Sequence, residues 1–162
     1  MKTYNILFLC THNSARSVIG EALASTDPSK KFVGYSAGST PGSRVNPFAA
    51  EIAETLGYPA SKLRSKSWDE FAAPDAPKMD FIITVCDNAA GEVCPIWHGH
   101  PATAHWGFLD PSQVQGSDEV KRHAFKEVMI GLRKRIELLA DLPIEKLDRM
   151  SMQAELKKLA DA

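Results

Sequence analysis

The sequence predicts an α/β protein built on an open four-stranded parallel sheet with helices on both faces. Two apolar runs, residues 5–9 and 81–85, are continuous rather than alternating, as in strands that are buried on both sides. Segments with helical spacing separate the strand-like runs along the chain. Because strands that alternate with helices form right-handed βαβ units, this order favours a parallel sheet.

The elements of the first half are predicted from apolar patterns and from their end signals. A strand at 5–9 ends at Cys10, and an amphipathic helix begins at Arg16. Its predicted apolar face consists of Val18, Ile19, Ala22 and Leu23. The other expected elements are a strand at 32–37, a helix that starts at Asn46-Pro47 and ends at Gly57, and a short helix around 68–71.

After the strand at 81–85, the second half is predicted to contain one more strand and two helices. The strand is expected at 104–108 and the last helix at 151–159. The long helix at 117–142 is indicated by apolar residues at every fourth position, Val120, Ala124, Val128, Leu132, Ile136 and Ala140, with Phe125, Met129 and Leu139 flanking them. Pro143 breaks it, so residues 143–162 are expected to form a helical C-terminal extension of a single domain spanning 1–162.

Composition narrows the class of protein. A chain of 162 residues can bury about 70% of its extended-chain surface, and its net charge of −1 gives no electrostatic footprint for nucleic acid. No apolar run approaches the length of a membrane span. Three cysteines, an odd number, argue against a secreted disulfide framework and favour reactive thiols. We therefore expect a cytoplasmic monomer that binds neither nucleic acid nor membrane.

The candidate functional stretch joins the first strand to the first helix and reads Cys10-Thr11-His12-Asn13-Ser14-Ala15-Arg16-Ser17. A loop wrapped around a helix N-terminus points backbone N–H groups inward, and the helix dipole adds positive potential. Arg16 can bind two oxygens of a tetrahedral anion through its planar guanidinium. The stretch therefore predicts an oxyanion site in which residues 11–17 bind the substrate.

Cys10 is the predicted nucleophile of this site. The positive field of the loop should lower the pKa of its thiol, and Ser14 or Ser17 could hydrogen-bond the sulfur. Asn13 could fix the loop through its side-chain amide. A cysteine that ends a buried strand is usually only a small apolar residue, but an arginine six positions later argues against that interpretation here. A nucleophile beneath a bound oxyanion is suited to displacement chemistry.

Two further groups are expected at the same edge of the sheet. Cys86 follows the strand at 81–85, and Asp110 follows the short strand at 104–108. Because ligands bind beyond the carboxyl ends of parallel strands, Cys10, Cys86 and Asp110 should converge. A carboxylic acid near a bound oxyanion can protonate a departing oxygen, although an Asp-Pro pair is also a common turn.

The pattern Cys10-x5-Arg16-Ser17 after an N-terminal strand resembles the low-molecular-weight protein tyrosine phosphatases and the arsenate reductases of the same fold. The resemblance covers about residues 4–142 and implies that Asp110, in the pair Asp110-Pro111, is the general acid. The segment from Cys86 to Cys94-Pro95, followed by residues 105–111, looks like the redox segment of thioredoxin-coupled arsenate reductases. That likeness implies that Cys86 attacks the arsenylated Cys10 and that Cys94 resolves the disulfide, with thioredoxin or a glutaredoxin-type protein as reductant.

The predicted function is therefore the reduction of arsenate to arsenite, with phosphate or sulfate as substrate analogues and no cofactor or metal. A phosphatase that uses only Cys10, Arg16 and Asp110 is the alternative enzyme, and a non-catalytic oxyanion-binding or redox-sensing module is the alternative outside enzymes. Against the phosphatase, the loop has Ala15 where many phosphatases carry a second cysteine, and Ser112-Gln113 replace the tyrosines that tend to follow Asp-Pro.

The sequence also contains candidate ligands for two metal sites. Zinc could use cysteines and histidines at 86, 94, 98, 100 and 105, but two cysteines eight residues apart lack the short spacing of structural zinc sites. Some arsenate reductases of this fold bind potassium beneath the loop. Asn13, Glu21 and Ser36 could match that site, but no convincing carboxylate follows Arg64.

Overall fold

The computed structural model describes residues 2–42, 44–86 and 101–162. Four parallel strands form one sheet in the order β2-β1-β3-β4: β1 (Tyr4–Cys10), β2 (Phe32–Gly38), β3 (Phe81–Thr84) and β4 (Ala102–His105). The α-helices are α1 (Arg16–Thr26), α2 (Pro47–Thr55), α3 (Asp69–Ala72), α5 (Asp118–Asp141) and α6 (Arg149–Lys158). Short 3₁₀ turns are η1 (Ala60–Lys62), η2 (Pro111–Gln113), η3 (Ile144–Lys146) and η4 (Leu159–Asp161). The predicted fold class is confirmed.

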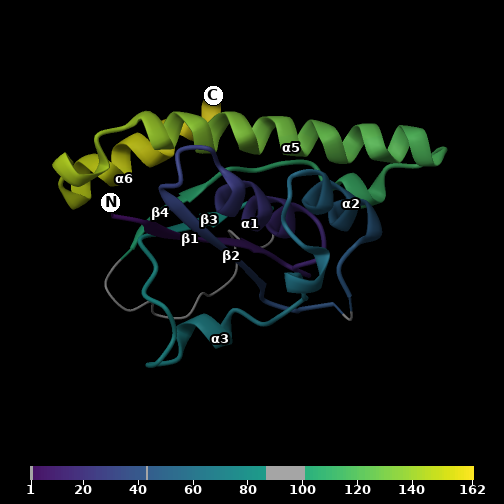
Figure 1. The fold of residues 1–162 in the computed structure, drawn as a ribbon, viewed down its shortest axis with the longest axis horizontal. Helices are drawn as coiled ribbons and strands as arrows, with labels where there is room; N and C mark the ends of the chain where they lie inside the picture. Colours follow the sequence, from purple (N-terminus) through teal and green to yellow (C-terminus); the bar gives the residue numbers. More distant parts are fainter. Residues whose placement is uncertain (1, 43, 87–100) are drawn as a thin grey trace.

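The two faces of the sheet are covered very unequally. Ile6 and Phe8 of β1 belong to the larger apolar core, to which α1, α5 and α6 contribute. Leu7 and Leu9 point to the opposite face, into a smaller core around Trp68. Figure 1 shows α1 between the sheet and the long α5, with α3 on the other side of the sheet. Both faces of β1 are buried, which explains its continuous apolar run.

Helix α1 is buried on every side rather than along one stripe. All residues from 17 to 24 are buried, because α1 contacts the sheet, α2 and α5. The close approach to the sheet depends on Gly20, where a Cβ would lie 2.6 Å from the ring of Phe8. The predicted apolar face of α1 is therefore part of a fully enclosed helix.

Helix α5 is confirmed, with Ser117 as its N-cap: the Ser117 hydroxyl accepts a hydrogen bond from Val120 N at 3.2 Å. Its buried stripe drifts from the predicted four-residue repeat, since an α-helix turns every 3.6 residues. Val120, at the start of the repeat, is 47% exposed, whereas Phe125 and Leu139 are buried. Figure 1 shows this first part of α5 extending beyond the sheet.

The two elements that differ from prediction meet at the edge of the sheet. β4 runs from Ala102 to His105 rather than over the predicted residues 104–108. Helix α6 begins two residues before the predicted 151, because Asp148 caps it by accepting from Ser151 N at 2.7 Å. The Gln153 side chain accepts from Thr103 N at 2.8 Å and also donates to the Thr103 carbonyl. The indole N–H of Trp106 donates to Leu156 O at 3.1 Å. Helix α6 thus closes the edge that β4 would otherwise expose.

The strand register brings the candidate groups to one end of the sheet. Cys10, the last residue of β1, pairs with Gly38 on one side, and Leu9 pairs with Thr84 on the other.

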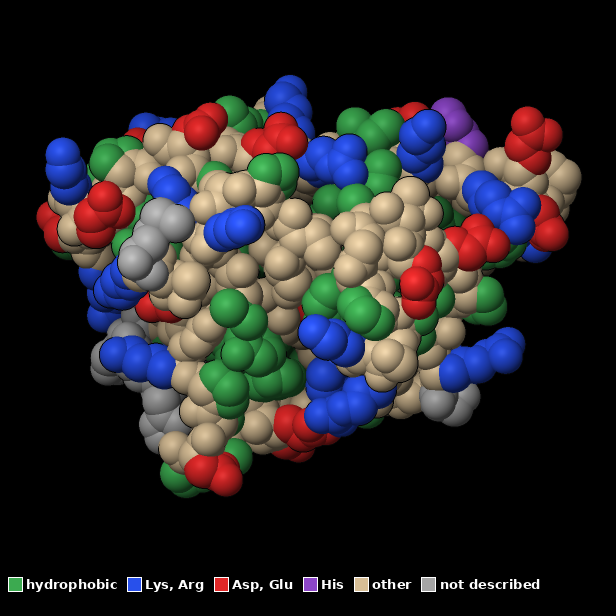
Figure 2. All heavy atoms as spheres, in the orientation of Figure 1, with side chains coloured by type: hydrophobic (Ala, Val, Ile, Leu, Met, Phe, Trp, Pro, Cys, Tyr) green, Lys and Arg blue, Asp and Glu red, His purple; other side chains and the backbone are tan. Residues whose placement is uncertain are grey.

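On the face shown in Figure 2, cationic and anionic side chains are interspersed. Among the helices of the described segments, none combines the length and the apolar character that a membrane crossing requires.

Candidate active site

The loop after β1 is held from outside through its carbonyl groups. The carbonyl oxygens of residues 11, 12, 13 and 14 accept hydrogen bonds from Thr40 N (2.9 Å), Gly42 N (2.9 Å), Ser65 Oγ (2.8 Å) and Asn46 N (2.8 Å), in that order. In a trans peptide the N–H points opposite to the C=O. The N–H groups of residues 12–15 are therefore directed to the inner side of the loop, as an oxyanion site requires.

Asn13 is the residue that fixes the loop's shape. It is fully buried and has a φ of 51°, in the left-handed region that asparagine tolerates better than most residues. Its side-chain oxygen accepts from Lys66 N at 3.0 Å, and its amide nitrogen donates to Ser17 Oγ at 2.9 Å. Beside it, a Cβ on Gly38 would lie 2.5 Å from the Thr11 carbonyl oxygen, so the end of β2 can approach only as glycine.

The Cys10 sulfur lies at the bottom of this loop, 2.8 Å from Ser17 Oγ. Of the two serines considered, Ser17 makes the contact. Because Ser17 Oγ accepts from the Asn13 amide, its hydroxyl proton is free to be donated to the sulfur. The nucleophile is therefore oriented by a hydrogen-bond path that runs from Asn13 through Ser17.

The electrostatics of Cys10 differ from the prediction. Burial raises the pKa of the Cys10 thiol, and this effect and the nearby Cys86 outweigh the hydrogen bonds from Ser17 and Asn13 that lower it. The predicted lowering is wrong for this arrangement, because a residue that is 3% exposed loses the hydration that a thiolate needs. The hydrogen bonds limit the rise rather than reverse it.

Arg16 and Asp110 meet over the loop. Arg16 Nη1 donates to Phe108 O at 2.8 Å, and Arg16 Nη2 lies 3.6 Å from Asp110 Oδ2. The other carboxylate oxygen of Asp110 accepts from Ser112 N at 2.9 Å and from Ser112 Oγ at 2.6 Å, so Asp110 also caps η2. Asp110 is thus both a turn residue and a carboxyl group beside the oxyanion loop.

Cys86 is the second buried thiol near the loop. It follows β3, and its sulfur lies 3.5 Å from the hydroxyl of Thr11. Cys10 and Cys86 are free thiols. Cys94, His98 and His100 lie outside the described residues. Among those that the structure describes, no group of three His, Cys, Asp or Glu side chains forms a metal site.

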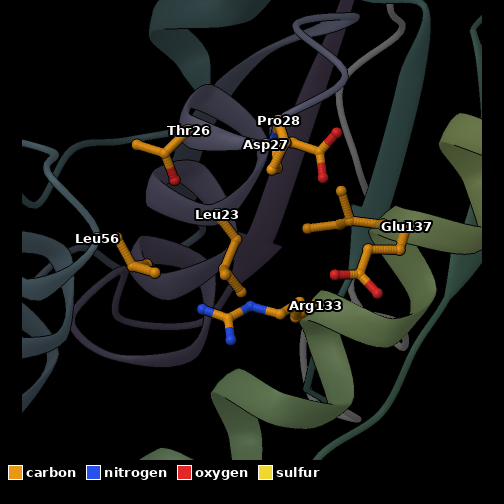
Figure 3. Close-up of a pocket in the computed structure, with 8 residues that line it drawn as sticks. Leu23, Thr26, Asp27, Pro28, Leu56, Arg133 and Glu137 are labelled. Atoms are coloured by element: carbon orange, nitrogen blue, oxygen red, sulfur yellow. The ribbon is translucent and has the colours of Figure 1, made fainter.

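A cavity on the helical side is separate from this loop. It has a volume of about 300 Å³ and lies between the end of α1, Leu56 and α5 (Figure 3). Arg133 and Glu137 of α5 line it together with Leu23 of α1, and no residue of the oxyanion loop does. The candidate active site is therefore the loop itself, at the carboxyl end of the sheet, as expected for this fold class.

The fold and the loop together define a phosphatase-type oxyanion site. Residues 5–154 match the family described as low molecular weight phosphotyrosine protein phosphatase, and the chain belongs to this family. An arsenate reductase from Halalkalibacterium halodurans is 36% identical over 141 residues, which cover 84% of this chain and 94% of that protein. The predicted resemblance to arsenate reductases of this fold is thereby confirmed.

Solved structures agree with this assignment. An arsenate reductase from Archaeoglobus fulgidus is 26% identical and superposes with a TM-score of 0.60, over 82% of this chain and 98% of that one. A thioredoxin-dependent arsenate reductase from Corynebacterium glutamicum is 26% identical, with a TM-score of 0.53, over 85% of this chain and 63% of that one.

The sequence analysis missed the residues that support the loop from below. Ser65 and Lys66 contact Asn13, and Glu21 accepts hydrogen bonds from Ser36 Oγ and Tyr58 OH, both at 2.6 Å. From the sequence, Glu21 and Ser36 are indicated only as potassium ligands. The one available signal was the position of Glu21, a carboxylate within the predicted apolar helix that starts at Arg16, which indicates a buried polar partner.

Proposed function

We propose that the protein reduces arsenate to arsenite, with Cys10 as nucleophile, Arg16 and the loop amides as the oxyanion site, and a disulfide relay through Cys86 and Cys94. The observation that carries this proposal is the second buried thiol, Cys86, whose sulfur lies 3.5 Å from the Thr11 hydroxyl of the oxyanion loop. Hydrolysis of a phosphate ester needs one thiol, whereas reduction needs a second thiol that forms a disulfide with the nucleophile. The arsenate reductases among the relatives support reduction.

In the first step, the Cys10 sulfur attacks arsenic while Arg16 and the loop N–H groups hold the oxygens. An S–As bond forms and an As–O bond breaks. Protonated Asp110 gives its proton to the departing hydroxide, which leaves as water, and the proton lost by the Cys10 thiol replaces it on Asp110. Arg16 Nη2 lies 3.6 Å from Asp110 Oδ2, which supports a role for both groups at the same bound oxyanion.

In the second step, the Cys86 thiolate attacks the Cys10 sulfur. The electron pair of the S–As bond passes to arsenic, so arsenic is reduced from As(V) to As(III) and arsenite leaves. Cys94 then attacks the Cys86 sulfur, which releases Cys10 as a thiol and leaves a Cys86–Cys94 disulfide. A dithiol protein supplies the two electrons that reopen it. Thioredoxin is the proposed reductant because one similar structure is a thioredoxin-dependent arsenate reductase.

The phosphatase alternative rests on the same three groups, Cys10, Arg16 and Asp110, and on the family to which the chain belongs. It requires an apolar wall for the aromatic ring of phosphotyrosine. Residues 112 and 113, after Asp110-Pro111, are serine and glutamine, and neither supplies such a wall. This argues for a small inorganic oxyanion as substrate.

One experiment separates the two functions. Purified protein is given arsenate, thioredoxin, thioredoxin reductase and NADPH, and NADPH oxidation is followed. A parallel reaction contains a chromogenic phosphate ester and no reductant. Arsenate-dependent NADPH oxidation that disappears without thioredoxin supports the proposal. Ester turnover without arsenate reduction would establish the phosphatase instead, and oxyanion binding without either reaction would indicate a binding module.

We further propose that the chain acts as a monomer in the cytoplasm, where thiols such as Cys10 and Cys86 stay reduced between turnovers. Residues 1–162 are proposed to work as one domain. Two hydrogen bonds to the C-terminal extension support this: Gln153 accepts from Thr103 of β4, and the Leu156 carbonyl accepts from Trp106, just after β4.

A further inference from the structure

A buried lysine lies beneath the oxyanion loop and contacts it through Asn13. The Lys66 side chain is 8% exposed, although lysine is almost never buried without partners. Its ammonium nitrogen is surrounded by oxygens from four parts of the chain: Arg64 O at 2.9 Å, Asn13 Oδ1 at 3.5 Å, Ser36 Oγ at 3.5 Å and Glu21 Oε1 at 3.7 Å. Such a cage of oxygens, with one carboxylate, is the environment of a bound cation.

The anionic member of the cage, Glu21, is itself fixed in place. Its carboxylate is 6% exposed and accepts from Ser36 Oγ and Tyr58 OH. Burial and the neighbouring Glu21 raise the pKa of Tyr58, so its hydroxyl keeps the proton that it donates to Glu21. The unit beneath the loop is therefore a buried ammonium–carboxylate pair with its hydrogen bonds supplied by protein groups.

This unit is connected to the nucleophile by a directed path of hydrogen bonds. Asn13 Oδ1 faces the Lys66 ammonium, while Asn13 Nδ2 donates to Ser17 Oγ at 2.9 Å, and Ser17 Oγ contacts Cys10 Sγ at 2.8 Å. A positive charge at the oxygen end of the amide polarises it and strengthens its N–H donors, and the next hydroxyl is strengthened in turn. The charge of the Lys66 ammonium thereby stabilises a thiolate at Cys10, although the two groups are not in contact.

Potassium does not fit this arrangement. The resemblance to potassium-binding arsenate reductases pointed to oxygens of Asn13, Glu21 and Ser36, and the structure does bring these oxygens together. The Lys66 ammonium, however, already lies 3.5–3.7 Å from all three. A second cation among the same oxygens would meet a like charge at close range, with one carboxylate to balance two positive charges.

We propose that Lys66 is a built-in monovalent cation, which takes the place of a soluble potassium ion beneath the loop and positions Asn13, Ser17 and Cys10. The proposal has two consequences. The stability and activity of the protein should not depend on potassium, unlike those of an enzyme that must bind the ion. Removing the lysine side chain should create a cation site, because the oxygens of Asn13, Ser36, Glu21 and Arg64 would remain.

A soluble cation could reach the vacated position. A cavity of about 570 Å³ borders the cage, and Glu21, Tyr58 and Lys66 are among the residues that line it. In a Lys66→Ala protein this cavity would extend to the four oxygens. In a Lys66→Met protein the charge would be lost equally, but the methionine would still fill the space. The two variants therefore separate loss of charge from creation of a site.

The test compares wild type, Lys66→Ala, Lys66→Met and the exposed control Lys78→Ala in potassium chloride and in tetramethylammonium chloride at equal ionic strength. The readouts are the melting temperature and the pH profile of Cys10 alkylation, neither of which depends on arsenate turnover, so the result stands whether or not the proposed function holds. Arsenate turnover is measured in addition. Loss of the Lys66 charge is expected to lower arsenate turnover by about 10- to 100-fold, as for other residues that orient the groups contacting a substrate.

Wild type and Lys78→Ala should give the same values in both salts. In tetramethylammonium, Lys66→Ala and Lys66→Met should both melt lower and alkylate at higher pH. Potassium should restore Lys66→Ala and leave Lys66→Met unchanged. A potassium-dependent wild type would overturn the proposal even if neither variant folds. Equal behaviour of the two variants in both salts, or an alkylation profile like that of wild type, would overturn it as well.

Discussion

The two described thiols of this site are held very differently. Cys10 ends a central strand and receives hydrogen bonds from Ser17 and from the backbone of its own loop, in which the carbonyl groups of residues 11–14 are bonded to neighbouring segments. Cys86 is equally buried, but its described side-chain contact is a single long one, 3.5 Å to the Thr11 hydroxyl. One thiol belongs to a network of hydrogen bonds, whereas the other, two residues beyond its strand, packs in the larger apolar core with one described hydrogen-bond contact.

This difference matches the two tasks that the proposed cycle assigns. A nucleophile that attacks a bound oxyanion gains rate from a fixed position, because a small misplacement costs much of the advantage of proximity. A thiol that attacks a neighbouring sulfur and is then attacked itself must change its position between steps. We therefore expect substitutions around Cys10 to act through orientation and charge, and substitutions of Cys86 to act by interrupting the relay.

The largest effect is expected for Cys10→Ser. Arsenate reduction and ester hydrolysis should both be abolished, because both reactions begin with attack by this sulfur. Binding of phosphate should survive, since the loop amides and Arg16 remain, and calorimetric titration measures it. Retained turnover in either assay would show that the nucleophile is another residue.

The relay predicts different trapped species for its two later cysteines. Cys86→Ser should lose arsenate reduction and keep ester hydrolysis. Cys94→Ser should release one arsenite and stop as a Cys10–Cys86 disulfide, whereas wild type without reductant should stop as Cys86–Cys94. Peptide mapping under non-reducing conditions identifies each bridge. An active Cys86→Ser protein with a Cys10–Cys94 bridge would reverse the assignment, and zinc bound at these cysteines would exclude it.

A smaller effect is expected at the rim of the loop. Asp110→Asn should lower turnover by about 10²- to 10⁴-fold, the usual contribution of a positioned acid. Affinity for phosphate should stay the same or improve, because a negative charge near the anion is lost. Ser112→Ala serves as the control, since it removes a hydrogen bond to Asp110 and keeps the carboxyl group. Unchanged turnover in Asp110→Asn would mean that the proton comes from elsewhere.

The smallest effect concerns the hydrogen bond to the sulfur. Ser17→Ala removes an interaction that lowers the pKa of Cys10, so alkylation of Cys10 should shift to higher pH and turnover should fall by about 10- to 100-fold, the value of one hydrogen bond to a charged group. Ser14→Ala is the matched control within the loop. An unchanged alkylation profile would show that Ser17 only fills space.

Stability should depend on pH with a defined sign. Because the pKa of Cys10 is raised in the folded protein, the unfolded chain loses this proton at a lower pH than the native one. The contribution of Cys10 is therefore complete below the thiol's ordinary pKa and is lost as the pH rises through the folded value. Urea unfolding of wild type and Cys10→Ala at rising alkaline pH measures this difference, which should be absent in the variant.

The elements of this fold could be predicted because their signals are local. The apolar runs at 5–9 and 81–85, the Asn46-Pro47 cap and the stripe of α5 depend only on neighbouring residues. The predicted bounds and buried faces were wrong where contacts with distant segments of the chain determine them. β4 takes its bounds from pairing with β3, and the strict four-residue repeat of α5 could not show that Val120 extends beyond the core.

For the site, the sequence by itself determined which reactive groups are present and which end of the sheet they share, because the carboxyl ends of parallel strands must meet. Only the tertiary structure decided their charges and partners. Burial reversed the expected shift of the Cys10 pKa, and Lys66, more than fifty residues along the chain, supplies the cation beneath the loop. Desolvation and Coulomb interactions depend on what lies within a few ångströms in space, and a linear pattern carries no measure of that distance.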